Sequence, residues 1–508
     1  MKRKYISIIA IVFAFGIAGC KKNYLDLETN PNQPSVTTPQ LALASAEVAA
    51  ARIVQTDYPQ YGVWSGYWTT SGNYTPNGPI NEYQITNGSF TTSGPGGFAW
   101  DDLYLNLANL NALKNLTSSD ATLGNFEAIA IIMEAYDYQQ IVDNYNDAPY
   151  SQAFNSTIVA PAFDKGSVIY EALGKQLDVA IALINKTASN SLAVSPASSD
   201  VAFAGDMTGW KKFANSLKLR LAIRVYTKTP SDPLVTDLAS TASEGYLDGT
   251  TQASVNPGYI QANSGAGVSQ QSPFYGAYGF DVTNNPTFGN VYYRANQYAV
   301  SYYLNNNDPR SAAFYAPDAA SGIIQGNVFG DTRTTLQNPN TSAIGPGLLQ
   351  SSTQNAVLFS GAESLFLQAE ALEDGLGITA GASFATAQEA YEAGITASFE
   401  ALGLTATQAT AYYSQTSANI GWSSSPNKEQ AIITQKWAAL NGWFNLEAYN
   451  EYRRTGYPAL PSSIDPAALG TTLPSRIFYP TTELTSNTAN VTKEGTLNQF
   501  TSKIFWAK

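Results

Sequence analysis

Apolar side chains recur at helical spacing along much of this 508-residue chain, and no other feature limits its fold more strongly. Steps of three and four residues predict a helix from Trp100 onward that buries one stripe of side chains. That stripe consists of Trp100, Leu103, Leu107, Leu110, Leu113 and Leu116. Similar stripes cover 169–184 and 210–225, the latter with Thr208 as its expected N-cap. Because each helix has a single apolar face, it must pack against others, and stacked antiparallel pairs are the simplest arrangement.

The rest of the chain divides into further helices and long irregular segments. Helices are expected over 39–55, 125–144, 359–374, 384–402, 405–415 and 426–450. The segment from about 228 to 356 lacks sustained periodicity and is rich in Gly, Asn, Ser, Thr and Tyr. It is too long for one structureless loop, so it should hold short helices and ordered excursions. The sequence therefore predicts a mainly α protein whose stacked helix pairs carry long irregular loops.

The N-terminus has the pattern of a secretory signal. A basic start at 2–4 is followed by an apolar run over 8–17 and by small residues that lead into Cys20. A cysteine at this place resembles the lipobox of bacterial lipoproteins, in which the cysteine is acylated. We expect residues 1–19 to be removed, Cys20 to carry the lipid, 20–38 to form a tether and 39–508 to form a single domain. The alternative is an ordinary signal peptide that happens to have a cysteine at its cleavage site.

Composition excludes several classes of function. The chain has no histidine, so Ser-His-Asp and Cys-His nucleophile systems and histidine zinc sites cannot form. Cys20 is the only cysteine, which leaves no internal disulfide. A formal net charge of -12 argues against binding to nucleic acid. Carboxylate chemistry of the glycosidase type stays open, but no pair of acidic residues stands out, and we do not expect an enzyme.

Neither a metal nor a cofactor is predicted. Asp143, Asp147 and Asp206 could contribute oxygen ligands to a structural Ca²⁺ site. Capping of helix ends is the favoured interpretation of these three carboxylates. A structural ion pair or a solvated face is likewise favoured over ligand contact for Arg220 and Arg224, which lie one helical turn apart. The cluster Glu451, Arg453 and Arg454 is interpreted in the same way.

Several segments, in order along the chain, resemble the SusD/RagB family of outer-membrane lipoproteins from Bacteroidetes. Besides the lipobox and Asn30-Pro31-Asn32, these segments are WDDLY at 100–104, VDNYNDAPY at 142–150, Gly205-Asp206, WKKFANSLKLR at 210–220, NDPR at 307–310, KWAALNG at 436–442, EYRRTG at 451–456 and RIFYP at 476–480. The resemblance implies helix pairs like tetratricopeptide repeats and a lipid anchor at the outer membrane, facing the cell exterior. It also implies a non-enzymatic protein that captures glycans and delivers them to a SusC-type TonB-dependent transporter.

Other functions stay open at this level. Some family members capture peptides, so a RagB-like peptide-binding protein is an alternative ligand class. A carboxylate-based glycoside hydrolase and a structural lid that contacts only the transporter are the two remaining candidates.

Aromatic residues outside the periodic helices are the candidate ligand site. Sugar rings stack their C–H faces on Trp and Tyr, while their hydroxyl groups need amide, hydroxyl or guanidinium partners. One cluster with this mixture comprises Trp64, Tyr67, Trp68, Asn73 and Tyr74. A second comprises Tyr275, Tyr278, Asn284, Asn285, Tyr292, Tyr293 and Arg294. The alternative is that these rings pack the loops or contact the transporter, where Trp and Tyr are also favoured.

Overall fold

The computed structural model describes residues 37–74, 78–85, 99–265, 267–333 and 336–508. The predicted signal peptide, Cys20 and nearly all of the tether lie outside these ranges. Within the described ranges, no helix combines the length and the apolar character that a membrane span requires.

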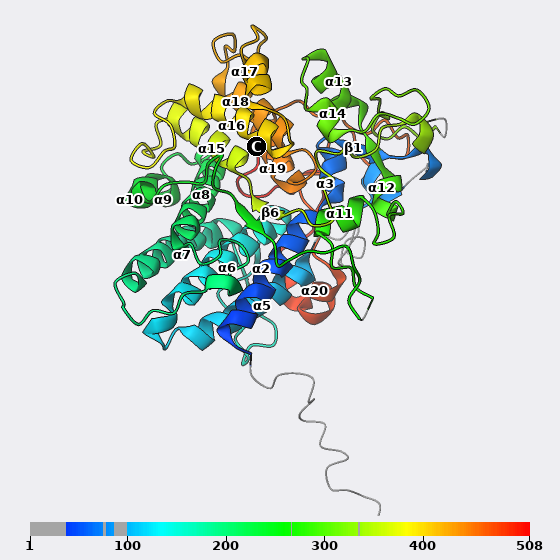
Figure 1. Ribbon diagram of the computed structural model, residues 1–508. Coiled ribbons are helices and arrows are strands. Elements are labelled where there is room, and N and C mark those ends of the chain that lie inside the picture. The colour runs from blue at the N-terminus through cyan, green and yellow to red at the C-terminus, as the bar shows by residue number, and fades with distance from the viewer. Residues whose placement is uncertain (1–36, 75–77, 86–98, 266, 334–335) are drawn as a thin grey trace, which may run out of the picture.

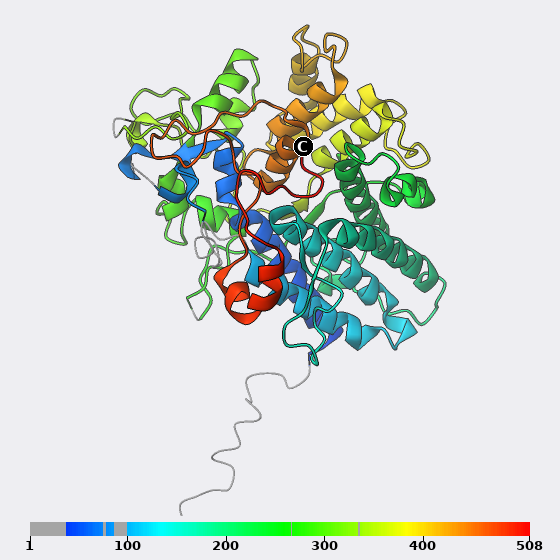
Figure 2. The same cartoon turned by 180° about the vertical axis from the view of Figure 1, so that it is seen from behind.

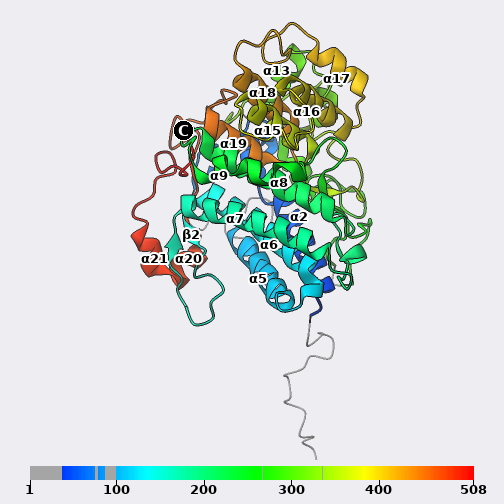
Figure 3. The ribbon, with the colours of Figure 1, turned by 90° about the vertical axis from the view of Figure 1, so that its left-hand side faces the viewer.

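Five long helices form the N-terminal stack. They are α2 (Pro39–Thr56), α5 (Trp100–Thr117), α6 (Gly124–Tyr145), α7 (Gly166–Thr187) and α8 (Met207–Tyr226). Helix α6 packs between α5 and α7, and α7 packs on α8 (Figure 3). The predicted stripe of α5 is buried from Trp100 to Leu113, although Leu116 is 41% exposed. The N-cap of α8 is Asp206 rather than Thr208, because the Asp206 carboxylate accepts a hydrogen bond from Thr208 N at 2.9 Å.

A second stack follows in the C-terminal half (Figure 1). It contains α15 (Gly361–Glu373), α16 (Ala387–Ala401), α17 (Ala406–Tyr413), α18 (Lys428–Leu440) and α19 (Asn445–Thr455). The single helix predicted over 426–450 is wrong, because the chain breaks between α18 and α19. Gly442 has a positive φ of 87° at the break, and a side chain there would also meet Leu348 Cδ1 at 2.5 Å. The paired packing of α15 with α16 and of α16 with α17 confirms the mainly α fold with stacked helix pairs.

The central segment contains short elements, as expected. Its helices are α9 (Pro233–Thr236), α10 (Leu238–Thr241), α11 (Pro273–Tyr278), α12 (Phe288–Tyr292), α13 (Gln297–Asn305) and α14 (Ser311–Phe314). Two more short helices, α3 (Pro59–Trp64) and α4 (Gly78–Asn81), follow α2. Short 3₁₀ turns lie at Gly72–Tyr74, Ala121–Leu123, Ala197–Ser199, Ala242–Glu244 and Asn338–Asn340.

Among the described residues there are three two-stranded antiparallel sheets, and two of them, β1–β5 and β4–β6, join distant parts of the chain. Strand β1 (Trp68–Thr70) pairs with β5 (Tyr293–Ala295), β2 (Ala148–Pro149) with β3 (Phe163–Asp164), and β4 (Ala253–Val255) with β6 (Ala356–Phe359). The chain after α19 crosses the back of the molecule (Figure 2) and includes α20 (Thr481–Ser486) and α21 (Thr488–Lys493). Its last tryptophan, Trp506, donates a hydrogen bond to Asp143 on α6 at 3.1 Å.

A buried network of charges joins the two stacks. Arg220 on α8 pairs with Glu363 on α15 at 2.8 Å, and Arg224 pairs with Asp143 on α6 and Glu447 on α19. Burial alone would raise the pKa of Glu447, but the charges of Arg220 and Arg224 outweigh it and hold that pKa below its ordinary value. These contacts confirm that the two arginines form structural ion pairs.

The cluster at the end of α19 belongs to the same network. Arg454 binds Glu451 and Glu370, each at 2.6 Å, and Lys436 on α18 binds Glu451 at 2.8 Å. Arg453 donates to the backbone carbonyl of Asp143 at 2.7 Å. The structural interpretation of this cluster is therefore confirmed.

The three carboxylates considered for Ca²⁺ are all bound by protein groups. Asp206 caps α8, and Asp147 accepts hydrogen bonds from Gly166 N at 2.8 Å and from Lys165 Nζ at 2.6 Å. Capping is thus confirmed for Asp206 and for Asp147, which caps the start of α7. It is wrong for Asp143, whose side chain belongs to the charge network.

Candidate functional site

The pairing of β1 with β5 brings the two predicted aromatic clusters together. Trp68 lies opposite Ala295, and Thr70 lies opposite Tyr293 in the antiparallel register. The contact continues past the strands, because Ser71 N donates to the carbonyl of Tyr292 at 2.9 Å. Two segments more than 200 residues apart therefore lie side by side, and part of each predicted cluster comes together where they meet.

Most of the predicted rings pack inside the protein. Trp64, Tyr67, Trp68, Tyr278 and Tyr293 are each at most 2% exposed. The Trp68 ring contacts Tyr278 and Tyr293 at centroid distances of 5.2 and 5.5 Å. The Tyr278 hydroxyl donates to Thr56 O at 2.8 Å. The prediction that these five rings are open platforms for a ligand is wrong, because protein side chains cover them.

Arg294 is also part of the packing rather than of an open site. Its guanidinium donates to Asn338 O at 2.9 Å and to Thr341 Oγ1 at 3.1 Å, and the side chain is buried. Burial lowers the pKa of Arg294 to about 10, although the charge of Asp318 acts in the opposite direction. Arg294 therefore holds the 338–341 turn against β5.

Three rings remain at the surface where the clusters meet. Tyr74 lies 5.3 Å from Tyr292 and 5.8 Å from Phe288, and Phe288 stacks on Tyr292 at 5.0 Å between ring centroids. Phe288 is 60% exposed, whereas Tyr74 and Tyr292 are half-buried. We call these three residues the Tyr74 cluster. Phe288 was missed because only Trp and Tyr were considered, although it lies within the same aromatic segment.

Asn73 adds a fixed amide beside the Tyr74 cluster. Its side chain is exposed, and its Oδ1 accepts hydrogen bonds from Asn338 N at 2.8 Å and from Ser71 Oγ at 3.0 Å. Gly72 N also donates to Leu336 O at 3.0 Å, which ties this turn to the same neighbouring segment. The cluster therefore combines apolar ring faces with a preorganised polar group.

The other exposed members of the second cluster lie farther along the same excursion. Asn284 and Asn285 form a tight turn in which Asn285 N donates to Asp281 Oδ1 at 2.9 Å. Asn284 accepts a hydrogen bond from Gln261 at 2.8 Å. Tyr275 on α11 is half-buried and packs near Phe280 at 6.1 Å. None of these contacts brings Asn284, Asn285 or Tyr275 into the Tyr74 cluster.

A wide cleft of about 760 Å³ borders the Tyr74 cluster. It lies between α2, the 257–273 segment, α11 and the start of α12, and Phe288 belongs to both its lining and the cluster. Its size falls within the range of roughly 300–1,000 Å³ that is usual for ligand pockets. Arg52 is the charged side chain of its lining and is paired with Asp102 at 2.7 Å.

Comparison with known protein families identifies the family of this chain. The family model described as SusD-like, starch-binding associating with outer membrane, matches residues 31–480. The chain belongs to the SusD-like family. No curated protein matches the sequence.

Solved SusD-like structures share the fold over nine-tenths of this chain. A SusD homologue from Bacteroides uniformis is 25% identical, with a TM-score of 0.70 over 92% of this chain and 99% of that one. A chitin-binding SusD homologue from Flavobacterium johnsoniae is 23% identical, with a TM-score of 0.72 over 91% and 98%. A SusD-like protein from Bacteroides thetaiotaomicron is 22% identical, with a TM-score of 0.69 over 91% and 98%.

The family-like sequence segments lie mainly in the helical frame. EYRRTG supplies Glu451 and Arg454 of the charge network, and KWAALNG supplies Lys436. VDNYNDAPY supplies Asp143. The Tyr74 cluster lies in none of the segments on which the resemblance rests. Membership of the SusD-like family thus accounts for the packed helices and their charge network, which we call the frame. Evidence for the ligand must come from the loops, where the Tyr74 cluster lies.

Proposed function

We propose that this SusD-like protein binds an oligosaccharide at the Tyr74 cluster and the adjoining cleft, without cleaving it. The observation that carries this proposal is the exposed three-ring surface of Tyr74, Phe288 and Tyr292 beside a cleft of about 760 Å³. Stacked rings offer apolar faces to the C–H faces of sugars, and Asn73 offers a hydrogen-bonding amide next to them. The SusD-like family and its chitin-binding member support a glycan as the ligand.

Binding without hydrolysis follows from the chemistry of the lining. Glycoside hydrolysis requires a pair of carboxyl groups placed on either side of the scissile bond. None of the described residues that line the cleft is an aspartate or a glutamate. The site therefore offers affinity and orientation, and no acid and base to act on a bound sugar.

Delivery to a membrane transporter is the second half of the proposal. We propose that lipid on Cys20 holds the protein at the outer membrane and that it passes its ligand to a SusC-type TonB-dependent transporter. Two acyl chains give stable anchoring, since each buried methylene contributes about 0.8 kcal/mol. Cys20→Ser should move the protein from the membrane fraction to the soluble fraction. An unchanged distribution between the two fractions would refute the anchor. The partnership is tested by isolating the tagged protein from detergent-solubilised membranes, and absence of a TonB-dependent transporter from its complexes would refute it.

Titration calorimetry tests the binding site. The purified protein is titrated with maltooligosaccharides, chitooligosaccharides and a control peptide of similar length. Phe288→Ala should weaken oligosaccharide binding about tenfold, because one ring contact contributes up to about 1.5 kcal/mol. Phe154→Ala is the matched control, since Phe154 is 40% exposed and lies outside the cleft lining. Equal oligosaccharide affinity of the Phe288→Ala and Phe154→Ala variants would refute the site. Binding of the control peptide but of no oligosaccharide would favour peptide capture.

A further inference from the structure

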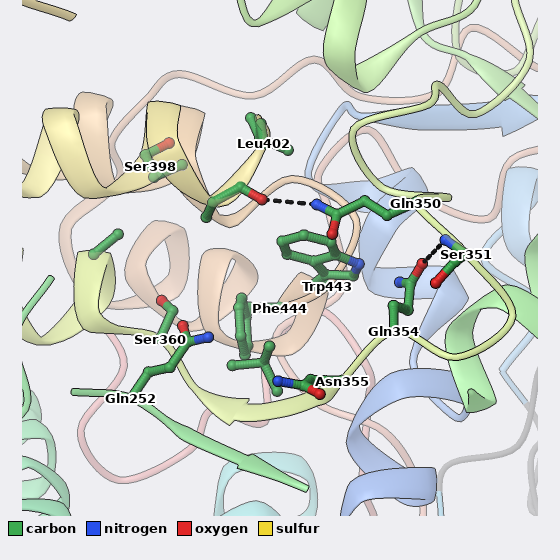
Figure 4. A pocket seen from close by; sticks show the side chains of 14 residues that line it. Gln252, Gln350, Ser351, Gln354, Asn355, Ser360, Ser398, Leu402, Trp443 and Phe444 are labelled. Carbon is green, nitrogen blue, oxygen red and sulfur yellow. Dashed lines mark hydrogen bonds between the residues drawn. The ribbon is translucent and has the colours of Figure 1, made fainter. Parts of the chain in front are cut away.

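A second cavity, of about 320 Å³, lies apart from the Tyr74 cluster. It is enclosed by the C-terminal end of α16, the 350–360 segment and the break between α18 and α19 (Figure 4). It shares no lining residue with the cleft beside the Tyr74 cluster. Its volume is at the small end of the range for ligand pockets, which begins at roughly 300 Å³. A ligand of one or two sugar rings, rather than a long chain, suits this size.

The lining of the cavity is uncharged and mixes polar with apolar side chains. None of its 14 described lining residues is Asp, Glu, Lys or Arg. A charged ligand would lose its hydration there without gaining an opposite charge, which is costly. A purely apolar ligand would leave the free atoms of the lining amides, such as Gln350 Oε1, without hydrogen-bond partners. The lining therefore suits a neutral ligand that both donates and accepts hydrogen bonds.

Two of the amides are held in position by the backbone and by a neighbouring side chain. Gln350 Nε2 donates to Ala401 O at 2.8 Å and to Gly347 O at 2.9 Å, which fixes the amide and leaves Oε1 as an acceptor (Figure 4). Asn355 Oδ1 accepts from Asn256 Nδ2 at 2.8 Å, which leaves the Asn355 amide nitrogen as a donor. Preorganised groups of this kind lose little entropy when a ligand arrives.

Trp443 supplies an aromatic surface in the same cavity. It lies at the helix break and is half-buried, whereas the adjacent Phe444 is only 3% exposed. Among the described residues, its indole nitrogen has no hydrogen-bond partner, so it can donate to a ligand. In the view of Figure 4, Trp443 stands at the centre of the lining, below Gln350. An indole surrounded by amides and hydroxyls is suited to an apolar sugar face edged by hydroxyl groups.

We propose that this cavity is a second binding site, which takes one or two units of a neutral saccharide against Trp443. The ligand's ring would contact the indole, and its hydroxyl groups would pair with Gln350, Asn355 and the exposed Gln252. This site goes beyond the Tyr74 cluster and does not depend on it, because the two share no residue.

Fluorine NMR of protein labelled with fluorinated tryptophan tests the second site. The chain has 8 tryptophans, and Trp443→Phe identifies the resonance of Trp443 by its disappearance. The disaccharides maltose, diacetylchitobiose, xylobiose and mannobiose are titrated separately to about 10 mM, which covers the weak affinities expected of a small ligand. At least one of them should shift the Trp443 resonance in a saturable manner. Failure of all four would overturn the proposal.

Two variants separate this site from the Tyr74 cluster. Gln252→Ala should raise the saturation midpoint of the Trp443 shift about three- to tenfold, since it removes one hydrogen-bonding group. Gln252 is exposed and its side chain has no hydrogen bond among the described residues, so its replacement should leave folding unchanged. Phe288→Ala should leave the Trp443 titration unchanged although it weakens binding at the Tyr74 cluster. Loss of the Trp443 shift in the Phe288→Ala variant would overturn a separate second site. An unchanged saturation midpoint in the Gln252→Ala variant would overturn it as well.

Discussion

Asp137 on α6 is a fully buried carboxyl group, and its ionisation should set a measurable part of the pH dependence of stability. It is 0% exposed, and Asn106 Nδ2 donates to its Oδ2 at 2.8 Å. No cation in the described part of the chain forms an ion pair with it. Burial raises the pKa of Asp137 to about 8, the Asn106 hydrogen bond offsets part of this effect, and Glu134 adds to it.

Comparing the folded and unfolded chains gives the direction in which stability changes with pH. In the unfolded chain this carboxyl group has its ordinary pKa of 3.8, so it loses its proton well below neutral pH. The folded protein keeps the proton up to about pH 8, and the cost of keeping it grows as the pH rises. Each pH unit in this window lowers the free energy of unfolding by about 1.4 kcal/mol, or about 3 kcal/mol between about pH 5 and pH 7.

Asp137→Asn removes this titration and keeps the shape of the neutral side chain. The free energy of unfolding of the variant should exceed that of the unmodified protein by on the order of 3 kcal/mol more at about pH 7 than at about pH 5. Urea unfolding followed by tryptophan fluorescence at the two pH values measures the difference. Glu400→Gln, at an exposed position, is the control and should show no such gain. A difference between variant and parent that is the same at both pH values would refute the reasoning.

Three further substitutions test the core, the charge network and the site. Trp68→Ala should lower the free energy of unfolding by about 3–5 kcal/mol in urea denaturation, because its ring is fully buried, and a loss below about 1 kcal/mol would contradict its place in the core. Arg224→Met should cost about 3–5 kcal/mol in the same assay, because it removes the ion pairs of Arg224 with two buried carboxylates, and a neutral effect would show that these pairs add nothing to stability. Gly72→Ala places a Cβ 2.6 Å from Leu336 O, so calorimetry should show weaker oligosaccharide binding at the Tyr74 cluster, and unchanged affinity would show that this turn does not shape the site.

The helices could be predicted from the sequence because periodicity is a local signal. The stripe that begins at Trp100 corresponds to α5, and the stripe over 210–225 corresponds to α8. Periodicity did not reveal the break between α18 and α19, since apolar residues continue at helical spacing through it. The Asn441-Gly442 pair was the available signal, because Gly442 adopts a positive φ that favours glycine.

The aromatic site could be predicted only in part because burial depends on distant contacts. Trp68 and Tyr74 lie only six residues apart and have similar neighbours in the sequence, yet Trp68 is in the core and Tyr74 is at the surface. What separates them is the pairing of β1 with β5, which covers Trp68 with Tyr278 and Tyr293. No feature within residues 58–99 specifies that pairing.

The division between frame and loops explains how a SusD-like fold can persist while its ligand changes. Arg224 pairs with Asp143 and Glu447 at the same time, so a change of any one of the three removes at least one buried ion pair and is costly. Phe288 meets no such demand, because it is 60% exposed and its replacement removes only surface contacts. Substitutions are therefore tolerated far more readily in the loops than in the network. The solved relatives fit this reasoning, since they keep TM-scores of 0.69 to 0.72 over nearly the whole chain at 22–25% identity.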